Sequence, residues 1–119
     1  MAKQQTIIKS VSLKGVGIHS GNEVNLTFKP AEDDFGYAFC RMDMPDKPII
    51  EADINYVVNT KRGTTLEKDG INIQTSEHVL AALVGLEIDN VLIELDSAEP
   101  PIMDGSSEFF VEALIKAGI

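Results

Sequence analysis

Eight consecutive residues without a polar side chain constrain this fold more than any other stretch of the chain. They are residues 79–86, VLAALVGL. A helix that is apolar on all sides is stable only when it is buried on all sides. A capping residue, Thr75 or Ser76, comes just before the run, and no helix breaker appears before Gly85. The sequence therefore predicts a buried helix that begins near the two capping candidates.

A second helix is predicted near the end of the chain, from Ser106 or Ser107 to Gly118. Its polar residues form a single stripe, and apolar residues cover the rest of its surface. The stripe consists of Glu108, Glu112 and Lys116. Both helices thus require cover on two sides, and a chain of 119 residues hardly supplies enough sheet for that. We expect a further covering surface, contributed by another domain or by another chain.

The first two thirds of the sequence read as strands. In residues 23–30, EVNLTFKP, apolar and polar residues alternate as in a half-buried strand. The order is a run of strands, a helix, a strand and a helix, which favours an α+β fold with a mostly antiparallel sheet and two helices packed on one face. We expect one domain over residues 1–119. The other expected strands are 5–17, 37–42, 90–95 and a hairpin in 64–74 that turns near residues 68–70, while 49–58 reads as extended but irregular.

Charge and composition exclude several classes of protein. The net charge is −9 and the pI is about 4.5, which argues against a nucleic-acid partner. No apolar stretch is long enough for a transmembrane segment. Cys40 is the single cysteine, so it cannot form a disulfide within the chain, and its place in an alternating strand favours a core position. A reducing, cytoplasmic location is expected.

Glu77 and His78 are the first candidates for chemistry, because both stand in the first turn of the predicted helix. Two interpretations remain open from the residues alone. Glu77 can be a first-turn acid favoured by the helix dipole, with His78 packing at a domain edge. Alternatively, the two form a catalytic pair, with His78 as a metal ligand. A catalytic zinc usually needs three protein ligands, so the companions of His78 would then lie on the missing surface.

Two further segments are weaker candidates. His19 lies in a glycine-rich turn, GVGIHSG at residues 15–21, which can approach a ligand or can simply be a surface turn. Lys61 and Arg62 form the single adjacent basic pair, which is either a solvated loop or a clamp for a small anion.

Four motifs in order carry a resemblance to a known family. They are GVGIHSG, SEHVLAAL, IDNVLIEL and PPIMDGSSEFFVEALIKAGI. Together they resemble the N-terminal half of the UDP-3-O-acyl-N-acetylglucosamine deacetylases, the zinc enzymes of lipid A biosynthesis in Gram-negative bacteria. The resemblance runs from about Thr6 to Ile119 with motif order and spacing kept.

The resemblance implies a fold and a site. The family has two similar α+β domains, whose helices are sandwiched between two sheets, with the active site at the junction. The resemblance implies Glu77 as general base and His78 as one of three zinc ligands. The other two ligands, a His and an Asp of an HxxxD motif, would belong to a second domain. His19 would line the site, and the loop of Lys61, Arg62 and Gly63 would border the substrate channel.

The resemblance also implies partners and a reaction. The substrate would be UDP-3-O-acyl-N-acetylglucosamine, the products acetate and a free amine, and the cofactor zinc. This domain would be inactive alone and would pair with the C-terminal domain of the same protein; its apolar helix faces also make self-association possible. The alternative is a non-catalytic interaction module that binds a partner through these helix faces.

Overall fold

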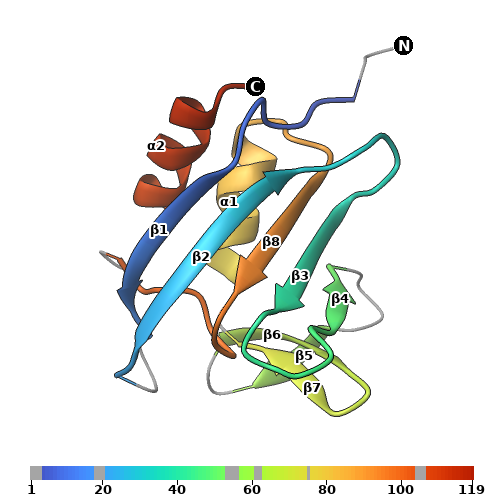
Figure 1. Cartoon of the computed structure of the whole chain (residues 1–119), viewed down its shortest axis with the longest axis vertical. Coiled ribbons are helices and arrows are strands. Elements are labelled where there is room, and N and C mark those ends of the chain that lie inside the picture. The colour runs from blue at the N-terminus through green and yellow to red at the C-terminus, as the bar shows by residue number, and fades with distance from the viewer. Residues whose placement is uncertain (1–3, 18–20, 53–56, 61–62, 75, 104–106) are drawn as a thin grey trace.

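The structure, a computed structural model, describes residues 4–17, 21–52, 57–60, 63–74, 76–103 and 107–119. These residues form two sheets and two helices, as the predicted α+β class requires (Figure 1). The strands are β1 (Val11–Val16), β2 (Glu23–Pro30), β3 (Tyr37–Arg41), β4 (Ile49–Glu51), β5 (Val57–Thr60), β6 (Gly63–Lys68), β7 (Ile71–Ile73) and β8 (Val91–Leu95). The helices are α1 (Glu77–Gly85) and α2 (Glu108–Ala117).

The larger sheet has five strands in the order β1-β2-β8-β3-β4. Its pairs are antiparallel except for β3 and β8, which run parallel, because α1 lies on the connection that returns the chain to β8. The register places Phe28, Ile93 and Phe39 in one row across three strands. Successive side chains of a strand point to opposite faces, so this row forms the floor of the core.

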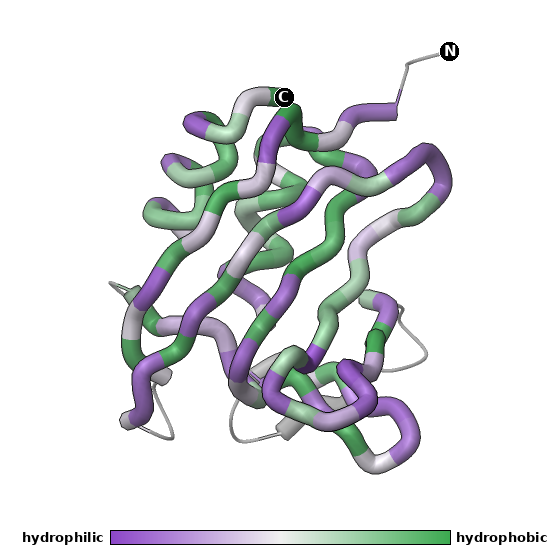
Figure 2. The backbone as a smooth tube through the Cα atoms, viewed as in Figure 1, coloured by the Kyte–Doolittle hydropathy of each residue, from purple (hydrophilic) through white to green (hydrophobic). Residues whose placement is uncertain are grey.

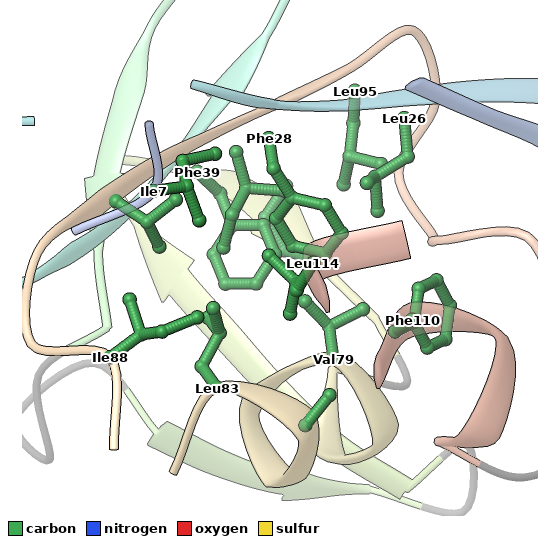
Figure 3. Packing of buried hydrophobic residues seen from close by; sticks show 14 of the residues in the cluster. Ile7, Leu26, Phe28, Phe39, Val79, Leu83, Ile88, Leu95, Phe110 and Leu114 are labelled. Carbon is green, nitrogen blue, oxygen red and sulfur yellow. The ribbon is translucent and has the colours of Figure 1, made fainter. Parts of the chain in front are cut away.

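Both helices contribute to that core. In α1 the buried residues are Val79, Ala82 and Leu83, and in α2 they include Phe110 and Leu114. Figure 3 shows these side chains converging on the phenylalanines of the sheet. The rings of Phe28 and Phe110 meet edge to face with centroids 6.4 Å apart, a favourable arrangement for aromatic pairs. α1 lies across one face of the sheet. α2 lies beside α1 and next to edge strand β1 (Figure 1).

A second sheet of three antiparallel strands, β5-β6-β7, was not predicted as a separate unit. The predicted hairpin is confirmed: its turn holds Asp69 at φ 54° and Gly70 at φ 80°, as a tight hairpin requires. Leu66 and Ile73 are buried and join the same core cluster. The segment 49–58, expected to be irregular, contains β4 and the start of β5, and its residues 53–56 lie outside the described residues.

The first predicted strand, residues 5–17, is too long. Only Val11–Val16 pair as a strand, because the residues before them bond elsewhere. The amides of Ile8 and Lys9 donate to the carbonyl oxygens of Gly118 and Ala117 at 2.8 and 3.3 Å. The N-terminal segment therefore fastens the end of α2 instead of extending the sheet.

The described chain buries only one side of α1, so burial of the other side stays a prediction that depends on the expected further covering surface. Ala81, Val84 and Gly85 are exposed, and Val84 is 64% exposed. Ala82, next to Ala81, is instead part of the core. The predicted polar stripe of α2 is exposed as expected, but so is Ile115, at 59%. Figure 2 shows hydrophobic residues along nearly the whole of α1.

The expected side-chain caps are also absent. Ser76 and Ser107 occupy the N-cap positions of the two helices, yet neither side chain forms a cap hydrogen bond. Thr75, the other capping candidate, lies outside the described residues. None of the helices in the described part of the chain is long and apolar enough to cross a membrane.

Candidate functional site

The candidate site lies at the N-terminal end of α1. Glu77 is the first residue of the helix and His78 the second, and both are half-buried. The amide of Leu80 donates to the carbonyl oxygen of Ser76 at 3.1 Å, which closes the first turn. The first amides of a helix have no acceptor within the helix, and the dipole makes this end favourable for negative charge. Glu77 therefore stands where a carboxylate is stabilised.

Packing fixes the orientation of this end. Val79, directly after His78, is completely buried, and so is Leu83 one turn later. Ser76, on the other side of Glu77, is also completely buried. Because the residues on either side of the pair are held in the core, the backbone of Glu77 and His78 is fixed at the end of the helix. Such support from packed neighbours is what a precise site requires.

The other predicted site residues fall mostly outside the described part of the chain, as His19, Lys61 and Arg62 do. Gly63 is described: it is the first residue of β6 and pairs with Thr60 of β5. It therefore borders the tip of the β5–β6 hairpin, and its place beside a substrate channel stays a prediction.

The residues on either side of His19, up to Gly17 and from Gly21 on, are described. The amide of Gly17 donates to Asn22 O at 3.0 Å, and the amide of Gly21 donates to Gly17 O at 2.9 Å. Gly21 has φ 70°, which suits glycine and few other residues. β1 leads into this turn at the same end of the large sheet as the N-terminal end of α1 (Figure 1). The topology thus brings the end of β1 and the Glu77–His78 pair to one end of the molecule, while His19 itself lies outside the described residues.

A metal ion would find only part of its ligand set here. Among the described residues, no three His, Cys, Asp or Glu side chains gather closely enough to hold one. His78 carries an imidazole nitrogen of the kind that zinc binds, and its role as a ligand stays a prediction. The chemistry of the donor is right for zinc, but the set within the described residues is incomplete.

Cys40 does not complete the set. It is buried, as expected, but it faces away from the helices, because its neighbour Phe39 points into the core. Its Sγ donates to the carbonyl oxygen of Lys47 at 3.4 Å. Burial, together with the charge of Glu94, raises the pKa of the Cys40 thiol, so the metal-binding thiolate form is disfavoured.

Two hollows on the described surface do not include the Glu77–His78 pair. One of about 430 Å³ lies between β1 and α2 and is lined by Lys14, Gly15, Val16, Ile102, Met103 and Phe109. Another of about 480 Å³ lies on the far face of the sheet near β4, with Phe35, Ile49 and four carboxylates around it. Neither is lined by Glu77 or His78, so the pair does not share these two hollows.

Sequence reasoning missed one buried carboxyl group. Glu99 is 2% exposed, and Pro100 and Pro101 after it are buried. The amide of Gln74 donates to the carbonyl oxygen of Ala98 at 2.6 Å, so this segment lies beside the approach to α1. No local signal marks this burial, because glutamate and proline are both residues that are mostly exposed.

The match to known proteins covers nearly the entire chain. The family model described as LpxC, UDP-3-O-acyl N-acetylglycosamine deacetylase, matches residues 4–119. This chain belongs to that family. The resemblance expected from the four motifs is therefore confirmed.

Curated members of the LpxC family are considerably longer than this chain. The bifunctional enzyme LpxC/FabZ of Chlorobaculum tepidum is 52% identical over 116 residues, which are 98% of this chain and 25% of that protein. The UDP-3-O-acyl-N-acetylglucosamine deacetylases of Histophilus somni and Pasteurella multocida are 48% and 47% identical, over all of this chain and 39% of theirs. The chain thus spans between a quarter and two fifths of these relatives.

Proposed function

We propose that this chain is the N-terminal domain of a zinc-dependent deacetylase that hydrolyses the acetamide of UDP-3-O-acyl-N-acetylglucosamine. The observation that carries the proposal is the Glu77–His78 pair, held at the N-terminal end of a core-anchored helix in a chain that belongs to the LpxC family. The reaction adds water across the amide bond and yields acetate and the free amine of the sugar. It would take place in the cytoplasm of a Gram-negative bacterium, as part of lipid A biosynthesis.

The domain would be inactive alone, because it offers only part of a site. His78 would hold the zinc together with a His and an Asp from a second domain, while Glu77 acts from this one. The exposed faces of the helices support such a division. Val84 is 64% and Ile115 59% exposed, so both helices offer large apolar side chains that a second domain could cover.

Zinc, when bound, would polarise the amide carbonyl and make water acidic enough to be deprotonated near neutral pH. Glu77 would accept the proton of the attacking water at a carboxylate oxygen and pass it to the nitrogen of the leaving amine. The helix dipole at this position favours the carboxylate that begins the cycle. Burial of Val79 and Ser76 would keep Glu77 oriented during both proton transfers.

Substrate contacts would come from the loops around this end. We assign His19 to the wall of the site and Lys61, Arg62 and Gly63 to the border of the substrate channel. A chain of net charge −9 would repel a diphosphate, so local cations are needed near the sugar nucleotide. Lys61 and Arg62, with cations of the second domain, would supply them.

The test uses the full-length protein and measures release of acetate from the acylated sugar nucleotide. Glu77→Gln should lower kcat by about 10²- to 10⁴-fold, the usual contribution of a general base, while zinc content and Tm stay unchanged. His78→Ala should lose zinc together with activity. Glu87→Gln, on an exposed residue beyond the other end of α1, is the matched control and should be fully active. An active Glu77→Gln enzyme would rule out the assigned base.

The exposed helix faces also favour a second candidate, a non-catalytic module that binds a protein partner through them. In that case the full-length protein would lack the HxxxD motif downstream, and no function of it would depend on metal. Sequencing the gene beyond the codon for Ile119 separates the two candidates directly.

A further inference from the structure

The segment that follows β8 touches both parts of the fold that lead into the candidate site. At its start, the carbonyl oxygen of Ala98 accepts the amide of Gln74, three residues before Glu77, at 2.6 Å. At its end, the amide of Ile102 donates to the carbonyl oxygen of Val16, the last residue of β1, at 2.8 Å. Residues 98–102 therefore span from the approach to α1 to the end of β1.

This segment is stiff. Pro100 and Pro101 are both buried, and each fixes its own backbone and restricts the residue before it. Glu99 is 2% exposed, so its carboxyl group is enclosed beside the approach to α1. Met103, the residue that follows, has φ 54°, a conformation that costs free energy for a residue with a side chain and persists only where the surroundings impose it.

The segment also presses directly on β1. A Cβ atom placed on Gly15 would lie 2.8 Å from Cβ of Pro101 and 3.0 Å from Sδ of Met103. Side-chain atoms essentially never approach that closely, so only glycine allows the segment to lie this near the strand. The contact and the hydrogen bond to Val16 hold the segment on two successive residues of β1.

From these contacts we infer that residues 98–102 form a brace that positions the N-terminal end of α1 against the end of β1. The inference rests on the proposed function, since it concerns the placement of Glu77 and His78. The core holds α1 through Val79 and Leu83, and the brace ties Gln74, which lies just before the helix, to the end of β1. Gly15 and Glu99 are the positioning residues: Gly15 sets the distance to the strand, and Glu99 lies at the end near α1.

The inference is tested in the full-length protein with Gly15→Ala. The new methyl group must push the brace away from β1, so kcat should fall by about 10- to 100-fold for a displacement near 1 Å, with KM roughly unchanged. Hydrogen exchange in peptides that cover residues 74–80 should become faster. Ser12→Ala, on the exposed outer face of the same strand, is the control and should change neither quantity.

A second variant guards against misfolding of the first. Glu99→Gln keeps the size of the side chain and adds no atom to the brace, and it should also lower kcat more than KM and speed exchange in residues 74–80. If both variants keep wild-type kcat per folded molecule and wild-type exchange there, the brace is overturned. That result differs from failure of the proposed function, in which Glu77→Gln would retain activity whatever the brace variants do.

Discussion

Asn90 connects three segments of the chain that are distant in sequence. It is 2% exposed, and each of its four polar groups has a partner. Its Oδ1 accepts the amide of Gly36 and its Nδ2 donates to Oε1 of Gln4, both at 2.8 Å. Its backbone carbonyl accepts the Thr6 hydroxyl, and its amide donates to Gln5 O. One side chain thus ties the N-terminal segment and the β2–β3 loop to the start of β8.

Asn90→Ala should therefore destabilise the chain more than an ordinary asparagine substitution. Removing the side-chain amide leaves the half-buried amide of Gly36 without its acceptor, which should cost about 1 kcal/mol, the lower end of the range for an unsatisfied buried group. Urea denaturation measures the loss. Asn25→Ala is the control, because Asn25 is exposed and bonds to Asp96 on the surface, where about 0.5 kcal/mol is expected. Equal losses in the two variants would contradict the role of Asn90.

At the scale of the element, α1 has a core face and an outer face that its sequence does not distinguish. Leu83 is completely buried and Val84, the next residue, is 64% exposed, although both are large and apolar. Hydrophobic periodicity cannot assign the faces of a helix that has no polar position between residues 79 and 86. The packing of Val79 and Leu83 on the sheet decides which side faces inward (Figure 3).

Adjacent substitutions in α1 test this assignment. Leu83→Ala should cost about 3 kcal/mol of unfolding free energy, because it opens a cavity in the core. Val84→Ala should change stability by less than about 0.5 kcal/mol, since exposed substitutions have small effects and alanine favours helix. Chemical denaturation of both variants of the 119-residue chain provides the comparison. Similar losses at the two positions would mean that the helix is rotated from the orientation described.

At the scale of the whole molecule, the helices expose large apolar side chains on the side that faces away from the sheet. Val84 and Ile115 stand there, whereas the far face of the sheet is largely polar along β2. The curated relatives extend well beyond the matched region, with 25% and 39% of their length covered. A second domain packed on the helices would account for both facts.

Substituting these residues should separate folding from association. In the 119-residue chain, Val84→Ser with Ile115→Ser should change Tm by less than about 2 °C but reduce self-association measured by sedimentation velocity. In the full-length protein the same pair should lower Tm clearly, because the interface would be buried there. Ile49→Ser, on the opposite face of the sheet, is the control and should alter neither measurement. If the two substitutions leave the Tm of the full-length protein unchanged, no domain packs on these helices.

Much of the fold could be predicted because its elements are marked locally. Residues 23–30 alternate as a strand must, Asp69 and Gly70 form a hairpin turn, and the run that begins at Val79 has no breaker before Gly85. The division into two sheets, the parallel pair of β3 with β8 and the short first strand could not be predicted, because they depend on contacts between distant residues. The amide of Ile8 bonds to the carbonyl oxygen of Gly118, 110 residues away, instead of extending β1.

The sequence alone determined the class of the fold, the family and the position of Glu77 and His78 at the start of a helix, because periodicity, turn chemistry and motif order are properties of neighbouring residues. Only the tertiary structure decided that Val84 faces outward and that Glu99 is buried. It alone brought Pro101 against Gly15, across more than 80 residues of chain. Burial and close approach are set by which distant surfaces pack together, and no local pattern contains that information.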